Sequence, residues 1–188
     1  MKKIALLLFV TLMSGCVQYS LVPAGPQTVK GLSFQSQTDW NKSPFNLGSN
    51  TEVWTQDGQL LNEIIFVGGV ETGDSIFRAS NRELPMPTYD ATMLPNEITE
   101  LVETSLKNYY GGQVVINSTN LRPQQVGDLT GFRFGLSFFT LEGLLKKGEV
   151  LALPQNDSLN LVIFMAAEIH YYDKSLTEID QLFDSISI

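Results

Sequence analysis

The sequence predicts an α+β fold, in which two amphipathic helices pack on a mostly antiparallel sheet. Two observations lead to this class. Apolar residues recur at helical spacing in two separate segments, 96–110 and 175–188, whereas much of the remaining chain forms short apolar runs joined by turn residues. Because consecutive strands with short connections pair in opposite directions, and the order is strands, helix, strands, helix, we expect an antiparallel sheet.

The first strands are expected between residues 29 and 67. Val29–Phe34 is a candidate first strand. Thr51–Gln56 and Gln59–Val67 flank Asp57-Gly58, a pair that supports the positive φ of a two-residue hairpin turn. The second arm of this hairpin is apolar enough to be a central strand, and we expect Gly68-Gly69 to end it.

The middle of the chain contains a long irregular segment and then the clearest helix. Glu71–Pro95 holds four Gly and Pro residues and has no regular pattern. Asn96–Tyr110 carries an apolar stripe at a spacing of 3.6 residues, with acidic residues in its first half. We expect Asn96 to cap this helix and Gly111-Gly112 to end it.

The last third predicts four strands and a closing helix. The strand-like runs are Gln113–Asn120, Gly131–Thr140, Lys147–Leu153 and Leu159–Tyr172. Residues 154–158 join the last two runs and have the composition of a turn. Ser175–Ile188 is expected to form the second helix, with Ser175 and Glu178 as a capping box.

The element order from Gly131 onward resembles the PsbP-like α/β/α sandwich. A strand pair, a long final strand and an apolar closing helix carry this resemblance. It rests on element order and on no diagnostic residue motif. The resemblance implies that one helix lies on each face of the sheet.

The N-terminus has the pattern of a secretory signal. Lys2 and Lys3 precede the apolar run Ile4–Met13, which is half the length of about 20 residues that a membrane-spanning helix needs. Small residues follow, and the segment Met13-Ser14-Gly15-Cys16 resembles the lipobox of bacterial lipoproteins. That resemblance implies cleavage between Gly15 and Cys16, diacylglycerol on the Cys16 sulfur and an acyl chain on its amine.

Several expectations follow from this lipobox. Residues 1–15 would be the signal peptide, 16–27 a lipidated cysteine with a short tether, and 28–188 a single α+β domain. The diacylglycerol and the additional acyl chain together are sufficient for stable membrane attachment. In Gram-negative lipoproteins, Val17 at the position after Cys16 implies transfer to the outer membrane, with the domain facing the periplasm or the cell surface. The alternative is an ordinary signal cleaved elsewhere, which leaves the only cysteine of the chain as a free thiol.

The charge of the chain restricts its partners. The formal net charge is −8, and loss of Lys2 and Lys3 with the signal peptide would make it −10. A surface this acidic repels phosphate, so we expect no nucleic-acid partner and no binding to anionic headgroups. The membrane would therefore be reached through the lipid on Cys16 and not through a basic patch.

The only catalytic candidate is a pair in the last predicted strand. His170 is the only histidine of the chain, and the period of a strand would put Glu168, His170 and Tyr172 on one face. This pair could serve a periplasmic hydrolase as base and orienting group. No serine stands in a nucleophile motif, so a structural polar cluster is the alternative interpretation.

No cofactor, metal site or enzyme motif is expected. The cysteine, the histidine and the scattered carboxylates show no metal-ligand spacing. The glycines of residues 66–73 match no phosphate-binding pattern. The sequence therefore favours a non-enzymatic binding or assembly module over a hydrolase.

A surface for a protein or ligand is expected in the long irregular segment. This segment contains two arginines and flexible methionines, which adapt to irregular partners. The candidate surface comprises Arg78, Arg82, Met86, Tyr89 and Met93. A protein partner in the cell envelope is the expected ligand.

Overall fold

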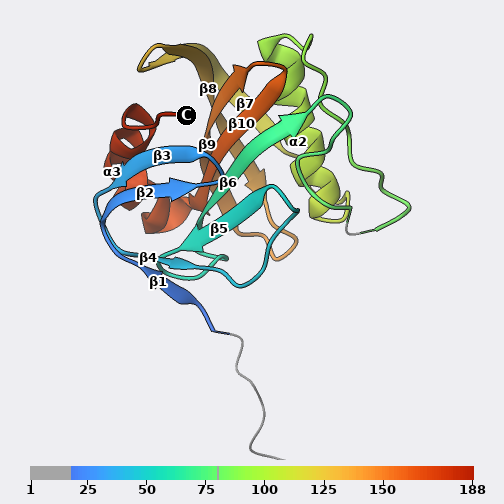
Figure 1. Ribbon diagram of the computed structural model, residues 1–188. Coiled ribbons are helices and arrows are strands. Elements are labelled where there is room, and N and C mark those ends of the chain that lie inside the picture. Colours follow the sequence, from blue (N-terminus) through green and yellow to red (C-terminus); the bar gives the residue numbers. More distant parts are fainter. Residues whose placement is uncertain (1–17, 80) are drawn as a thin grey trace, which may run out of the picture.

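The computed structural model describes residues 18–79 and 81–188. Its main feature is an eight-stranded antiparallel sheet with the strand order β1-β4-β5-β6-β10-β9-β8-β7 (Figure 1). The strands are β1 (Ser20–Val22), β4 (Trp40–Lys42), β5 (Thr51–Thr55), β6 (Asn62–Glu71), β7 (Asn117–Val126), β8 (Leu129–Phe139), β9 (Leu145–Gln155) and β10 (Ser158–Ala167). The predicted fold class is therefore confirmed.

Two layers cover the sheet, one on each face. Helix α2 (Pro95–Tyr109) and the loop 72–94 pack on one face. Helix α3 (Asp173–Asp184) and a separate hairpin, β2 (Gly25–Val29) with β3 (Leu32–Ser36), pack on the other. Figure 1 shows α2 and α3 on opposite sides of the strands. This is the α/β/α sandwich that the element order predicted.

The central strands are buried on both faces. In β10, Ile163 contributes to the core under α2, whereas its neighbours Val162 and Phe164 contribute to the core under α3. In β6, Ile65 and Phe66 divide between the two cores in the same way. Period-two alternation therefore supplies apolar side chains to both layers, as central strands covered on two sides require.

The predicted hairpin between residues 51 and 67 is confirmed, but its turn is longer than expected. Strands β5 and β6 pair antiparallel, with Thr51 opposite Val67 and Trp54 opposite Ile64. The connection runs over residues 56–61, because the Asn62 side chain accepts hydrogen bonds from the N–H groups of Gln56 and Asp57.

Several predicted strand boundaries are wrong. The strand expected at 113–120 is β7, which begins at Asn117 and continues to Val126. Residues 29–34 are not one strand, because Lys30 and Gly31 have positive φ and form a two-residue turn between β2 and β3. Gly68-Gly69 does not end β6. The strand pairing continues through a bulge, where the N–H of Gly69 donates to Asn160 Oδ1 at 2.9 Å.

Position 68 requires glycine for a steric reason that is separate from the bulge. A Cβ at this position would lie 1.9 Å from the carbonyl oxygen of Lys30, which belongs to the turn of the β2–β3 hairpin. The hairpin backbone therefore approaches β6 too closely for any side chain at position 68.

The two helices form in the expected segments, although their first turns differ from the prediction and α3 ends at Asp184, before the expected Ile188. Leu94, not Asn96, is the N-cap of α2, and its N–H donates to Glu97 Oε2 at 2.7 Å. Gly111 and Gly112 end this helix with positive φ, as predicted. The capping box at Ser175 is absent, because α3 begins at Asp173 and the Glu178 carboxylate bonds to another layer of the fold.

The predicted last strand is too long by five residues. β10 ends at Ala167, and residues 168–172 form a single wide helical turn in which His170 has a φ of 72°. Strand alternation therefore does not extend to Glu168, His170 and Tyr172.

Only part of the predicted N-terminal region lies among the described residues. The signal peptide 1–15 and Cys16 lie outside the described residues. The predicted tether 16–27 overlaps β1, which pairs with β4 from Ser20 onward, and the first part of β2. The folded region therefore begins before the expected boundary at residue 28.

We predict that Gly68→Ala lowers the free energy of unfolding by about 2 kcal/mol, since the added methyl group collides with backbone and not with a movable side chain. Urea denaturation followed by circular dichroism measures this. Gly69→Asn is the matched control, because no atom lies within 4 Å of a Cβ at position 69 and Asn tolerates its φ of 65°. Equal losses in the two variants would contradict the close approach.

Candidate functional site

The predicted surface in loop 72–94 does not form one patch. Arg78 and Arg82 are exposed, and Met86 and Met93 are half-buried against the core under α2. Tyr89 is only 2% exposed, so its assignment to a surface is wrong. Its backbone makes two bonds across the loop, to Gly73 and Asp74, and these hold the aromatic ring inward.

Met93 borders an apolar groove between the start of α2 and the strands β7 and β8. The groove has a volume of about 330 Å³. It is lined by Met93, Pro95, Ile98, Leu121, Arg122, Pro123, Thr130, Gly131, Phe132 and Pro154. Most of these residues are apolar, which is the composition of a site that binds apolar groups.

The local sequence explains how the groove forms. Pro95 lies in the first turn of α2, a position that tolerates its missing N–H, and Ile98 in the same turn is buried in the core under the helix. The pairing of β7 with β8 shifts between Thr119 and Arg122, and Leu121 within this irregularity is 43% exposed. Gly131 leaves no room for a side chain, because a Cβ there would lie 2.4 Å from the carbonyl oxygen of Ala152.

Sequence reasoning included only Met93 of this groove. The available signal was the pair Leu121 and Pro123 within an otherwise polar strand. Pro in a strand marks an edge or a bulge, and an exposed leucine beside it is a feature of such a site.

Glu168 and His170 do not form the predicted catalytic pair. Glu168 Oε1 lies 3.2 Å from Lys147 Nζ and forms an ion pair with it. The exposed His170 ring stacks edge-on against Tyr171, with 5.3 Å between the ring centroids. The alternation that would have aligned the two side chains ends at Ala167, so the geometry offers no support for this assignment.

A charge network around the buried Arg133 joins α3 to the sheet. Arg133 of β8 bonds to Glu149 of β9 at 2.6 Å and to Asp180 of α3 at 2.6 Å. Tyr172 donates to Glu149 Oε1 at 3.0 Å. Burial alone would lower the pKa of Arg133, but its carboxylate partners outweigh this effect and raise it. Burial and the Glu149 charge raise the pKa of Tyr172. These groups are paired with one another, which is typical of a structural network.

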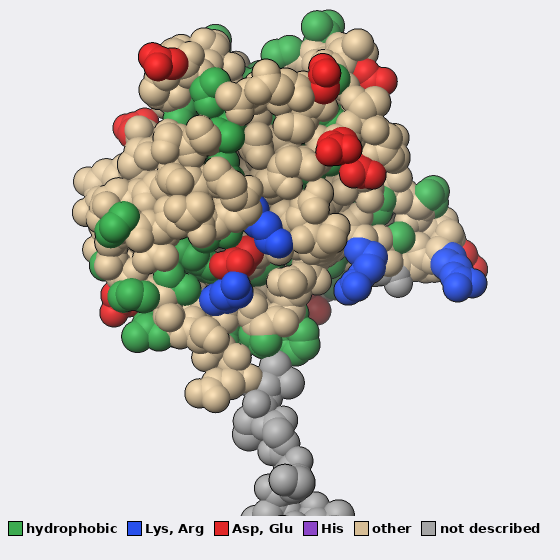
Figure 2. Space-filling view, viewed as in Figure 1, with side chains coloured by type: hydrophobic (Ala, Val, Ile, Leu, Met, Phe, Trp, Pro, Cys, Tyr) green, Lys and Arg blue, Asp and Glu red, His purple; other side chains and the backbone are tan. Residues whose placement is uncertain are grey.

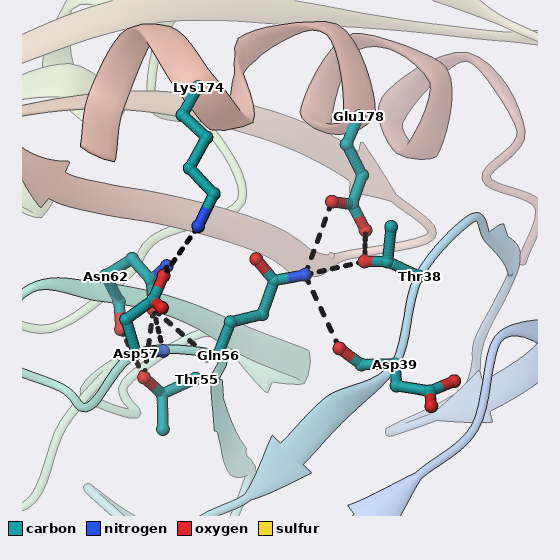
Figure 3. A network of polar contacts seen from close by, with 8 residues as sticks. All are labelled: Thr38, Asp39, Thr55, Gln56, Asp57, Asn62, Lys174 and Glu178. Carbon is teal, nitrogen blue, oxygen red and sulfur yellow. Dashed lines mark hydrogen bonds and ion pairs between the residues drawn. The ribbon is translucent and has the colours of Figure 1, made fainter. Parts of the chain in front are cut away.

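A second polar cluster links α3 to the opposite part of the sheet (Figure 3). Glu178 accepts hydrogen bonds from Thr38 and from Trp40 Nε1, the latter at 2.9 Å. Lys174 lies 3.2 Å from Asp57 in the turn between β5 and β6. These contacts therefore hold the turn between β5 and β6, and the start of β4, against α3.

The other face contains a buried ion pair. Lys146 Nζ lies 3.1 Å from Glu63 Oε1 and also donates to the carbonyl oxygen of Gln59 at 3.0 Å. Both charged residues are less than 10% exposed. Burial raises the pKa of Glu63, and the Lys146 charge opposes this rise. The pair is closed off from solvent, so it contributes to structure and presents no group to a ligand.

Residues 18–79 and 81–188 contain no cluster of three or more His, Cys, Asp or Glu side chains arranged to hold a metal ion. Across the same part of the chain, neither helix has both the length and the apolar content to cross a membrane.

The sequence matches no protein-family model and no curated protein. The fold, in contrast, resembles solved structures. The solution structure of cyanobacterial PsbP (CyanoP) from Synechocystis sp. PCC 6803 aligns with a TM-score of 0.60 at 9% identity, and the alignment covers 94% of this chain and 95% of that chain. A crystal structure from Bacteroides thetaiotaomicron aligns with a TM-score of 0.51 at 9% identity, covering 88% of this chain and 48% of that one.

LpqN of Mycobacterium tuberculosis, whose structure is described as involved in cell envelope biogenesis, aligns with a TM-score of only 0.33 at 10% identity, over 95% of each chain. This score is too low to support an argument. The alignment with CyanoP confirms the predicted PsbP-like fold, and at 9% identity it shows the fold alone.

We predict that Glu63→Gln lowers the free energy of unfolding by about 3 kcal/mol, because it leaves Lys146 buried without its counter-charge. The double variant Glu63→Leu, Lys146→Met should recover to within about 1 kcal/mol of the parent, since two apolar side chains need no partner. Chemical denaturation of the single and double variants measures both values. A double variant no more stable than Glu63→Gln would contradict this structural role.

Proposed function

We propose that this protein is a lipid-anchored, non-enzymatic module of the cell envelope, which binds an apolar segment of a protein partner in the groove between α2 and β8. The observation that carries the proposal is the groove itself. Its wall is mostly apolar and includes the exposed Leu121, and the exposed Leu94 lies in the chain between the lining residues Met93 and Pro95. Apolar side chains left exposed next to a preformed groove are typical of binding sites for other molecules.

A protein segment fits this groove better than a small polar substrate. Arg122 is the only charged residue in its wall, and the Arg122 guanidinium lies 3.7 Å from Glu149, to which it is paired. The wall therefore offers few directed polar contacts and a volume suited to one or two apolar side chains. Recognition of this kind uses apolar anchor residues surrounded by a polar rim.

The attachment to lipid rests on the lipobox Met13-Ser14-Gly15-Cys16. Acylation of Cys16 would hold the domain at the outer membrane, on its periplasmic or its outer surface. The acidic composition of the chain supports attachment through lipid, since the net charge of −8 disfavours binding to anionic headgroups.

We predict that Cys16→Ala releases the protein from the membrane fraction, because the acyl chains can no longer be attached. Fractionation of cells followed by immunoblotting measures this. Met13→Leu is the matched control, because it keeps the lipobox and should leave the protein with the membrane. Unchanged membrane association of Cys16→Ala would refute the lipid anchor.

The groove is tested by placing a photo-crosslinking amino acid at Leu121 in intact cells. We expect a discrete adduct with one protein, whereas the same probe at the exposed Phe45, which does not line the groove, should give none. Met93→Glu should reduce the Leu121 adduct about tenfold, the effect of losing one apolar anchor. No adduct at Leu121, or the same adducts at both positions, would contradict the assignment.

A further inference from the structure

The two ends of the sheet differ in the chemistry of their connections. We call basal the end formed by the connections 56–61, 110–116 and 140–144, together with the wide turn 168–172. Neighbouring connections adjoin one another. Leu61 accepts a hydrogen bond from the Ala167 N–H, and Ala167 pairs with Lys146 at the start of β9. Asn117 at the start of β7 pairs with Ser137 near the end of β8. The opposite, apical end carries the turns 127–128 and 156–157, the end of the connection 43–50, and the loop 72–94 that leaves β6.

Large apolar side chains are exposed in every basal connection. Their exposed fractions are 76% for Leu60, 72% for Val115, 61% for Phe139, 63% for Leu141 and 70% for Ile169. They follow the sheet from β6 across β10, β9 and β8 to β7, which is four strand spacings, or roughly 20 Å. The basal end therefore presents a row of apolar side chains rather than a single isolated one.

The short apical turns have the opposite character. Gly127-Asp128, Asn156-Asp157 and the segment Gly48-Ser49-Asn50 are small, polar or acidic. The two longer connections at this end each expose one large apolar side chain, which is Phe45 at 58% and Leu94 at 61%. On the face shown in Figure 2, several acidic side chains lie toward the top of the molecule, and apolar side chains lie both at the top and at the bottom. Exposed large apolar side chains are therefore more numerous at the basal end than at the apical end.

Charges at the basal end are largely neutralised within the protein. Lys147 is paired with Glu168 at 3.2 Å, and Lys174 with Asp57 at 3.2 Å. Among the described residues, these ion pairs leave few basic side chains at the basal end to attract an anionic surface. Apolar side chains among paired charges suit a surface of zwitterionic headgroups, into which aliphatic and aromatic groups can partition.

The path of the chain indicates what lies next to this end. The Tyr19 hydroxyl donates to Gln59 Oε1 at 3.4 Å, so the side chain that precedes β1 reaches the basal connection 56–61. From Cys16 to Ser20, where β1 begins, the chain can extend by roughly 13 Å at most. A lipid on Cys16 would therefore keep the basal end close to the bilayer surface.

We propose that the basal end is a membrane-contacting face, whose row of apolar side chains enters the interfacial region of a zwitterionic bilayer and orients the domain. This inference rests on the proposed lipid anchor. Because Pro154 and Thr130 at the groove lie toward the apical ends of their strands, the same orientation turns the groove away from the bilayer and leaves it open to a partner.

The test uses the full lipidated chain in phosphatidylcholine vesicles. Single Leu60→Cys and Leu141→Cys variants are labelled with an environment-sensitive fluorophore, since acylation occupies the thiol of Cys16. Asp128→Cys, in an exposed apical turn, is the control with the same dye. On transfer from detergent to vesicles, we expect the emission at positions 60 and 141 to shift to shorter wavelength and to be quenched by a lipid-attached quencher, with neither change at position 128.

Two measurements test the membrane-contacting face and the lipid anchor separately. Labelling of the parent chain at Cys16, together with failure to float with vesicles, would refute the anchor itself. Flotation with unshifted emission at positions 60 and 141 would refute the membrane-contacting face while the anchor stands. A shift seen in native envelopes but not in pure lipid would show that a protein covers the basal end, and would also overturn the proposal.

Discussion

Burial of the central strands on both faces is the constraint on which the remaining structure depends. Ile163 in β10 faces one core, and Val162 and Phe164 face the other. An apolar sheet of this kind is stable only when each face is covered, so the fold needs two layers outside it. Helix α2 and loop 72–94 form the first layer, and α3 with the β2–β3 hairpin forms the second.

The second layer is held by contacts that join distant parts of the chain. Arg133 bonds to Asp180 on α3, Glu178 bonds to Trp40, and the β2–β3 turn approaches the sheet at Gly68. Charged groups at a layer boundary lose solvation, and they are tolerated because each has a partner of opposite charge or a hydrogen-bond donor. These polar contacts determine where α3 and the hairpin lie on the sheet, whereas apolar burial supplies most of the driving force.

The arrangement of the layers separates two surfaces of different chemistry. The groove beside Met93 lies toward the apical end, where α2 starts. The exposed apolar row lies at the basal end, where the Tyr19 side chain contacts Gln59. A module with these two surfaces can contact a bilayer at one end and a partner protein at its side. The PsbP-like fold alone implies neither surface, since both depend on side chains at the ends of elements.

Local signals in the sequence determined the elements of this fold. Helical periodicity and Gly111-Gly112 located α2, and alternating apolar runs located the sheet strands, because these patterns act over a few residues. Only the tertiary structure decided the sites. Tyr89 became a core residue, Glu178 bonded across layers instead of capping its helix, and the strand ended before His170. Each outcome depends on a neighbour distant in sequence, and local propensity carries no information about which segments will meet.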